Sequence, residues 1–165
     1  MKLIEEHHIN SAIATANNLS EEEIDGFVSR FKEAQPILFV YLLAVCEDEL
    51  DDEEIESLFF TGVIIWYATQ LAGANVPAVT SETLEEVDAQ NAELLSKLSP
   101  DDEEEEIIFD FESLVHNHAQ PNLLEFALVS SFDDEALDHD SAGLFFMSLK
   151  TFIECLDKQG GANAA

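Results

Sequence analysis

The chain has 165 residues, of which 47 % are hydrophobic and 25 % charged, and its 36 acidic residues outnumber 6 basic ones to give a formal net charge of −30 at pH 7. The hydrophobic content excludes a disordered acidic chain, which would lack bulky apolar side chains. Repulsion between like charges argues against direct binding to nucleic acid or to an anionic membrane. We therefore expect a folded protein that prefers basic partners or cations.

Signals for helix starts and stops recur from one end of the chain to the other. Ser20 with Glu23, and Asp51 with Glu54, have the spacing of capping boxes. Apolar residues recur at helical spacing, and no segment alternates convincingly like a β-strand. The predicted helices are 3–17, 20–34, 36–46, 52–72, 81–97, 100–118, 121–131 and 140–157.

Two further start signals and two breaks complete this division. Thr80 precedes one predicted helix, and Ser99 with Pro100 at the first helical position precedes the next. Gly73 is expected to end a helix at the beginning of the segment GANVPAVT. The last residues, 159–165, are predicted to form a flexible tail.

Similar sequence segments recur in the two halves of the chain. Ala34–Pro36 and 119–121 both read Ala-Gln-Pro before an apolar stretch, and Leu58–Phe60 matches Leu144–Phe146. At the N-terminus, Ile4–Glu6 aligns weakly with Leu84–Glu86. We therefore predict one all-α domain at 1–158, built from two tandem, pseudo-symmetric units of about four helices each. Unit one is 1–75, the linker is 73–80, and unit two is 80–158.

The repeated Ala-Gln-Pro has a structural and a functional interpretation. Proline disfavours helix in the residue before it and suits the first turn of the next helix, which predicts a tight corner between two helices. The alternative is a peptide-binding notch formed by Gln35 and Gln120.

The paired phenylalanines are predicted to be mainly core residues. Because adjacent residues on a helix cannot face the same way, one of each pair is a candidate for a groove or a dimer interface. Phe60 and Phe146 are the candidates, and a homodimer remains an open alternative.

The cellular location is predicted to be the cytoplasm. The N-terminus lacks the apolar region of a signal peptide, and Cys46 and Cys155 are expected to be buried free thiols rather than a disulfide. Residues 57–81 contain no charge, but their apolar part is shorter than a membrane span and is predicted to be a buried central helix.

Candidate metal sites are weak. The acidic runs 47–54 and 132–140 lack the glycine of an EF-hand loop. Glu5 and His8 have the Glu-x-x-His spacing of di-iron bundles, yet the matching segment, 85–88, lacks the histidine. We predict no metal site and keep Glu5 and His8 as the only candidates.

The sequence contains no motif for nucleophilic, phosphate-binding or cofactor-dependent catalysis. No cofactor and no catalytic residue is predicted. The favoured hypothesis is a non-catalytic acidic helical protein that mediates protein–protein interaction. The first alternative is an acidic decoy or inhibitor, either a nucleic-acid mimic or a neutraliser of a basic partner. The second is a helical-bundle metalloprotein that uses carboxylates and histidine.

Overall fold

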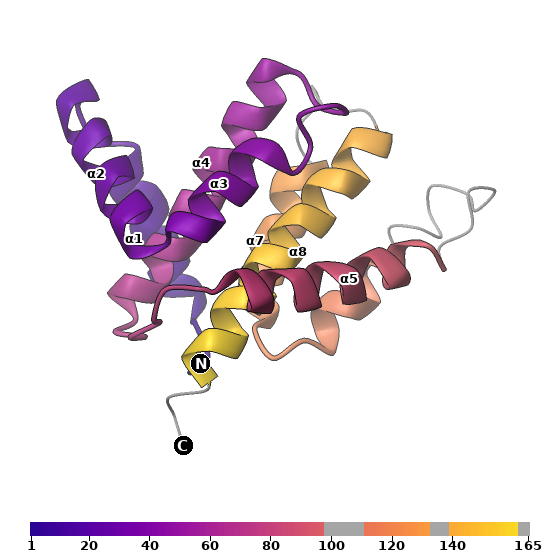
Figure 1. Ribbon diagram of the computed structural model, residues 1–165. Helices are drawn as coiled ribbons and strands as arrows, with labels where there is room; N and C mark the ends of the chain where they lie inside the picture. The colour runs from indigo at the N-terminus through magenta and orange to yellow at the C-terminus, as the bar shows by residue number, and fades with distance from the viewer. Residues whose placement is uncertain (98–110, 133–138, 162–165) are drawn as a thin grey trace.

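The computed structural model in Figure 1 describes residues 1–97, 111–132 and 139–161, and every regular element in these ranges is helical. Residues 111–116 form a helical stretch in addition to seven helices with defined bounds. Those are α1 (Glu6–Ala16), α2 (Glu21–Ala34), α3 (Pro36–Ala44), α4 (Asp52–Leu71), α5 (Ser81–Leu95), α7 (Pro121–Phe132) and α8 (His139–Gly161). The all-α class and the single compact domain are confirmed.

The predicted helix caps are formed by the expected side chains. The Ser20 hydroxyl accepts the N–H of Glu23, whose carboxylate accepts the N–H of Ser20 at 2.8 Å. Asp51 and Glu54 make the same reciprocal pair at the start of α4. Thr80 accepts the N–H of Thr83 at the start of α5. The predicted cap at residues 99–100 lies outside the described residues.

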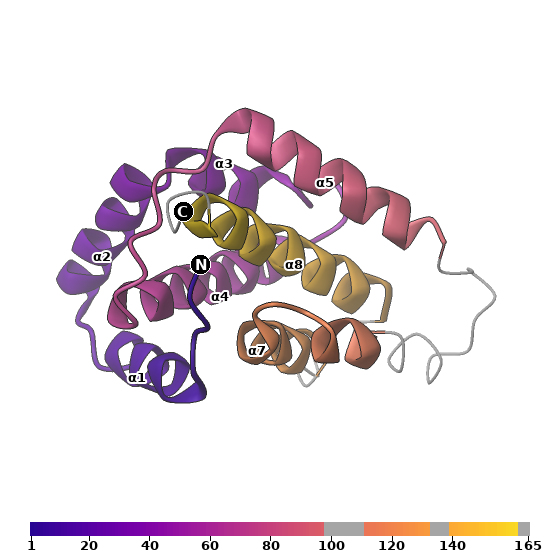
Figure 2. The ribbon, with the colours of Figure 1, turned by 90° about the horizontal axis from the view of Figure 1, so that it is seen from below.

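Helices α4 and α8 form the centre of the molecule, and the other helices surround them. Figure 2 shows α8 with α5 on one side and α7 on the other, and α4 lies against α1, α3 and α8. α4 is buried around much of its circumference, as predicted for the uncharged stretch; Leu58, Val63 and Ile65 are at most 1 % exposed. In the described part of the chain, no helix has the length and apolarity needed to cross a bilayer.

Aromatic rings join the helices in the core. The ring of Phe31 on α2 lies 5.3 Å from Trp66 on α4 and 6.1 Å from Phe152 on α8. On the other side of the core, Phe146 lies 4.7 Å from Phe111. These contacts tie segments distant in sequence into one hydrophobic cluster.

Gln35 fixes the extended segment that precedes α5. Its side chain is fully buried at the corner between α2 and α3. Its Nε2 donates to the carbonyl of Pro77 at 3.1 Å, and its Oε1 accepts the N–H of Val79 at 2.8 Å. A single side chain therefore satisfies one carbonyl and one amide of a segment that has no sheet partner.

Gln120 does the same for the segment that precedes α1. Its Nε2 donates to the carbonyl of Lys2 at 3.1 Å, and its Oε1 accepts the N–H of Ile4 at 3.0 Å. The N–H of Ile4 thus binds Gln120 as the N–H of Val79 binds Gln35, whereas the sequence alignment set Ile4 against Leu84. Because residues 1–4 are held in this way, α1 begins three residues later than predicted.

The last turn of α8 packs against the first residue of the chain. The Met1 ammonium donates to the carbonyl and to Oδ1 of Asp157, both at 3.0 Å. A Cβ on Gly160 would come within 2.6 Å of the Met1 side chain, so this close approach depends on glycine. α8 accordingly continues to Gly161 instead of ending at 157, and the predicted tail is helical over its first three residues.

We predict that Gln35→Met destabilises the fold by roughly 2–4 kcal/mol, because methionine has a similar shape but leaves the buried N–H of Val79 without its acceptor. The free energy of unfolding would be measured in urea, which does not screen the protein's charge. Gln90→Met is the matched control at an exposed helical position, and we expect it to change stability by less than about 0.5 kcal/mol. Equal effects of the two substitutions would contradict the structural role of Gln35.

Candidate interaction surface

Helix α3 is apolar on every side and nevertheless lies at the surface. Its sequence, PILFVYLLA, contains no charged residue. Leu38 and Leu42 point into the core and are at most 1 % exposed, but Val40 is 60 % exposed and Leu43 is 43 % exposed. A helix that is apolar all round is normally buried, so the outer face of α3 is a candidate contact surface.

Helix α7 follows the same Gln-Pro corner and gives a direct comparison. Counted from the proline at the first helical position, Val40 of α3 corresponds to Glu125 of α7. Both side chains are exposed. The structure therefore places a carboxylate in water on one helix and an isopropyl group on the other, which distinguishes the face of α3 from an ordinary surface.

A shallow groove of about 480 Å³ lies between α3 and α5. Its α3 side is formed by Ile37, Val40 and Ala44, together with Tyr41. The α5 side contributes Leu84 and Asp88. The groove is therefore apolar along most of its length and carries one carboxylate at its edge.

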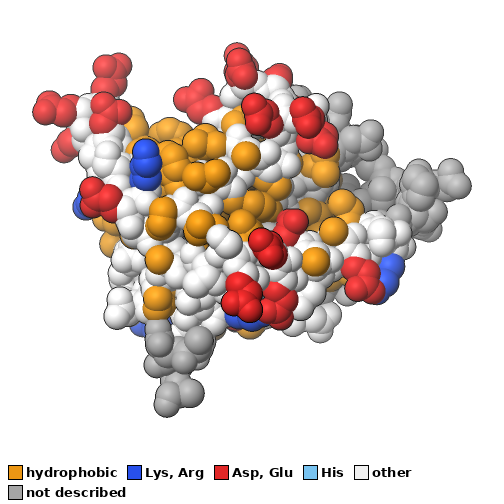
Figure 3. Space-filling view, viewed as in Figure 1, with side chains coloured by type: hydrophobic (Ala, Val, Ile, Leu, Met, Phe, Trp, Pro, Cys, Tyr) orange, Lys and Arg blue, Asp and Glu red, His pale blue; other side chains and the backbone are white. Residues whose placement is uncertain are grey.

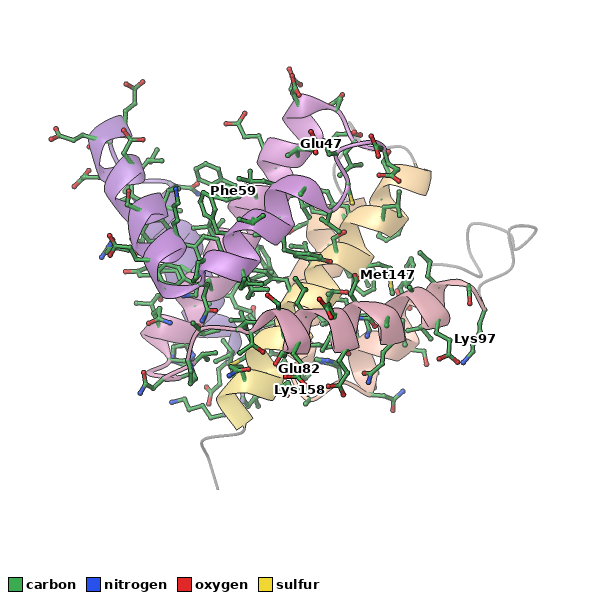
Figure 4. The ribbon with its side chains drawn as sticks, in the orientation of Figure 1. Glu47, Phe59, Glu82, Lys97, Met147 and Lys158 are labelled. Carbon is green, nitrogen blue, oxygen red and sulfur yellow. The ribbon has the colours of Figure 1, made fainter. Side chains whose placement is uncertain are left out.

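A smaller pocket of about 130 Å³ lies next to this groove, between the end of α3, α5 and α8. Tyr41, Val45 and Asp88 line both the groove and the pocket. Figure 4 shows Met147 of the pocket between α8 and α5. The two hollows thus meet at the C-terminal half of α3.

Carboxylates border the apolar face of α3. Figure 3 shows hydrophobic side chains over α3 and its neighbours, with acidic side chains around them and a basic side chain at their edge. Lys32 of α2 lies over the ring of Phe39 on α3. Glu47, Asp48 and Glu49 are exposed just beyond the C-terminal end of α3, and Glu85 and Asp88 are exposed on α5. The negative end of the α3 dipole points the same way. This border would attract a cationic partner.

A buried polar cluster joins α5 to α8 behind the pocket. Nζ of Lys150, only 5 % exposed, donates to Oε1 of Glu154 and to Oδ1 of Asn91, both at 2.6 Å. Nδ2 of Asn91 donates to Oε2 of Glu154 at 2.6 Å and to the Thr151 hydroxyl at 3.0 Å. The charged groups are therefore satisfied by one another, as buried charges must be.

His118 completes the cluster. Its Nε2 lies 3.3 Å from Oε1 of Glu154, and its Nδ1 accepts the N–H of Gln120 at 3.0 Å. Burial alone would raise the pKa of Glu154, but hydrogen bonds from His118, Lys150 and Asn91 outweigh it and lower the pKa to about 2. Glu154 is thus held as a carboxylate, which suits a structural link better than an acid–base catalyst.

The nucleophilic side chains nearby are not activated. Burial raises the pKa of the Cys46 thiol, and it also raises the pKa of the Tyr41 hydroxyl. Cys155 is buried too, and burial raises its pKa to about 12. Both cysteines are free and buried, as predicted. Thiols in such surroundings are poor nucleophiles because the thiolate is the reactive form.

The predicted interaction residues lie mostly in the interior. Gln35 and Gln120 are at most 1 % exposed and bind backbone of their own chain. Phe146 has no exposed surface, because Phe111 and the surrounding core cover it, so its side chain lines no groove. Phe60 is half-buried, and its role in a groove or interface stays a prediction.

The predicted metal candidates do not form a site with each other. Glu5 is exposed, and its Oε2 lies 3.4 Å from Nδ1 of His7 rather than from His8. The ring of His8 packs against that of His7 at a tilt of 37°, with centroids 3.8 Å apart. Across the three described ranges, no three His, Cys, Asp or Glu side chains converge closely enough to hold a metal ion.

Sequence reasoning missed the α3–α5 groove and the Lys150 cluster. Aligning the two Ala-Gln-Pro segments in the sequence places Val40 opposite Glu125. This difference indicates that the outer face of α3 is more apolar than that of α7. Lys150 carried a weaker signal: it interrupts an apolar stretch four residues before Glu154. Asn91 and His118 gave no local signal, because their partners are distant in sequence.

The lowered pKa of Glu154 predicts a pH-dependent contribution to stability. A carboxyl whose folded pKa of about 2 lies below its ordinary value of 4.5 stabilises the fold above pH 4.5, and this contribution is lost as the pH falls toward 2. We therefore expect Glu154→Gln to destabilise the protein in urea unfolding at pH 6 and to cost much less at pH 2.5. Glu93→Gln, which removes an exposed partner of Lys97, should cost little at either pH. A cost of Glu154→Gln that is independent of pH would refute this role.

Comparison with known proteins gives no assignment for this surface: no protein-family model, no curated protein and no solved structure matches the chain.

Proposed function

We propose that this protein is a non-catalytic interaction module that binds a basic amphipathic helix of a partner protein on the outer face of α3. The observation that carries the proposal is the all-apolar α3, which exposes Val40 at a position where α7 exposes Glu125. The groove between α3 and α5 extends this face sideways. An amphipathic helix laid in an apolar groove is a recurrent mode of protein recognition.

The charge of the surroundings selects a cationic partner. Exposed carboxylates of Glu47, Asp48 and Glu49 lie at one end of α3, and Asp88 lies at the edge of the groove. The net charge of −30 attracts a basic partner over a distance and speeds its association. A helix with leucines on one face and lysines or arginines on the other matches both the apolar floor and the acidic border.

The same charge argues against a second copy of the chain as the occupant. Two copies that meet at their α3 faces would bring two acidic borders together, and the repulsion would be strongest at low salt. The homodimer suggested by the sequence is therefore the less favoured occupant, and the experiment below includes it as an outcome.

The chemistry near the surface supports a non-catalytic role. Burial raises the pKa of Cys46 and Tyr41. Lys150 and Glu154 bind each other, and Asn91 forms a hydrogen bond with each of them. None of these groups is poised for proton transfer or nucleophilic attack. The two buried free thiols also support the cytoplasm as the proposed location.

We also propose that the chain consists of two tandem, pseudo-symmetric units that hold one another. Gln35 in the first half binds the segment that starts the second, and Gln120 in the second half binds the segment that starts the first. This reciprocity supports the proposal. It also suggests that the two corners have diverged, since only α3 retains an all-apolar face.

An acidic decoy for a basic protein is the alternative, and it would depend on charge instead of the α3 face. The two proposals differ in the effect of an added carboxylate. We predict that Val40→Glu weakens binding of an 18-residue leucine–lysine amphipathic peptide at least about tenfold, because a carboxylate would be buried against the apolar side of the helix. Fluorescence anisotropy of the labelled peptide measures the affinity in 0.15 M salt.

Val129→Glu is the matched control, because it adds the same charge at an exposed position of α7. It should bind the peptide as well as or slightly better than the wild type. Urea unfolding checks that both variants remain folded, which we expect because glutamate favours helix more than valine does. Tighter binding by both variants would favour the decoy. A change of the wild type from dimer to monomer on Val40→Glu, measured by sedimentation, would favour self-association and overturn the proposal.

A further inference from the structure

We infer that the 130 Å³ pocket between α3, α5 and α8 receives a single aliphatic side chain, leucine or methionine, of the bound basic helix. This inference rests on the function proposed above and specifies which part of the partner is recognised. The pocket and the groove share Tyr41, Val45 and Asp88, so a helix lying along α3 passes directly over the pocket.

The size of the pocket favours a side chain over a free small molecule. Sites for cofactors and drug-sized ligands have volumes of about 300–1,000 Å³. A hollow of about 130 Å³ is well below that range. It therefore fits an anchor residue, which belongs to a larger surface that supplies the rest of the binding energy.

The lining favours an apolar anchor. Val45, Leu95, Leu144 and Met147 contribute aliphatic or thioether surface. The polar atoms in the wall already have partners: Sγ of Cys46 lies 3.3 Å from the Ser148 hydroxyl, which donates to the carbonyl of Leu144 at 2.8 Å. A polar head inserted here would lose water and gain few hydrogen bonds.

Asn91 and Thr151 reinforce this selection at the inner wall. The amide nitrogen and oxygen of Asn91 are both already hydrogen-bonded. Nδ2 donates to Thr151 and Glu154, and Oδ1 accepts from Lys150. A lysine or arginine that entered head first would therefore find the Asn91 oxygen already bound to Lys150. Cationic residues therefore belong at the mouth, where Glu49 and Asp88 line the pocket.

This arrangement defines a recognition pattern. One leucine or methionine enters the pocket, and a lysine or arginine about one helical turn away meets Glu49 or Asp88. A helix with the same charge but only alanine on its apolar face would keep the ionic contacts and lose the anchor.

The two methionines of the chain provide an internal reporter and an internal reference. Met147 lines the pocket, whereas Met1 lies against Asp157, about 15 Å further along α8 at 1.5 Å per residue. With ¹³C-methyl-methionine labelling, titration with the leucine–lysine peptide should shift the Met147 methyl signal and leave the Met1 signal in place. A peptide with alanines in place of the leucines should leave both signals unchanged.

A pocket-filling variant tests the anchor separately from the α3 face. Ala92 lines the pocket, so Ala92→Leu would occupy its mouth, and Ala89→Leu is the matched control at an exposed position of α5 outside the pocket. We expect Ala92→Leu to weaken peptide binding about tenfold and to abolish the Met147 shift, with no change for Ala89→Leu.

The outcomes separate the two proposals. Suppose that Val40→Glu weakens binding, but the Met147 signal stays fixed and Ala92→Leu binds like the wild type. The proposed anchor in the pocket is then wrong, and the proposed binding surface on α3 is supported. If Val40→Glu has no effect, or if the wild type does not bind the peptide, the proposed function fails and the anchor fails with it.

Discussion

The position of α5, and with it the whole candidate surface, depends on the side chain of Gln35. A glutamine amide offers an acceptor and two donors on one rigid group. At the corner between α2 and α3, this group takes up a carbonyl and an amide of residues 76–79, and α5 begins two residues later. The corner that starts α3 therefore also sets α5 beside it. The groove between the two helices depends on these hydrogen bonds together with the packing of α5 on α8 and the polar cluster around Asn91.

The fold tolerates its large negative charge partly because many carboxylates lie where they stabilise helices. Acidic residues fill the first turns of α2 and α4, where they face the positive end of the helix dipole. Among the described residues, Lys97 pairs with Glu93, Lys150 with Glu154 and Lys158 with Glu86. The remaining carboxylates repel one another. Aromatic packing around Phe31 and Phe111 opposes that repulsion and lets the acidic chain stay compact.

What could be predicted from the sequence was local, and what could not depends on distant contacts. Capping residues and prolines gave the starts of α2, α3, α4 and α5 to within a residue, because a helix start is decided by its own first turn. The late start of α1 could not be predicted, since residues 1–4 are held by Gln120 from the other half of the chain.

The candidate site shows the same division. The hydrophobicity of α3 was evident in its sequence, but periodicity cannot say which side of an all-apolar helix is left uncovered. The partners of Lys150 come from α5 and from His118, so only the folded chain brings them together. Phe146 was assigned a possible surface role because its neighbour was expected to fill the core. Both rings are buried instead, since the helices around α8 enclose it on several sides.

The reaction rates of the two buried thiols report on two different parts of the native protein. Cys46 lies in the wall of the pocket just beyond the end of α3, and Cys155 lies in the C-terminal half of α8. Burial disfavours the thiolate at both positions, so both thiols react slowly with an alkylating reagent in the folded protein. Cys155 lies in the closed core and reacts only when the surrounding helices separate, whereas a reagent reaches Cys46 through the pocket. The rate of modification at Cys46 therefore measures access through the pocket, and the rate at Cys155 measures how often the centre of the molecule comes apart.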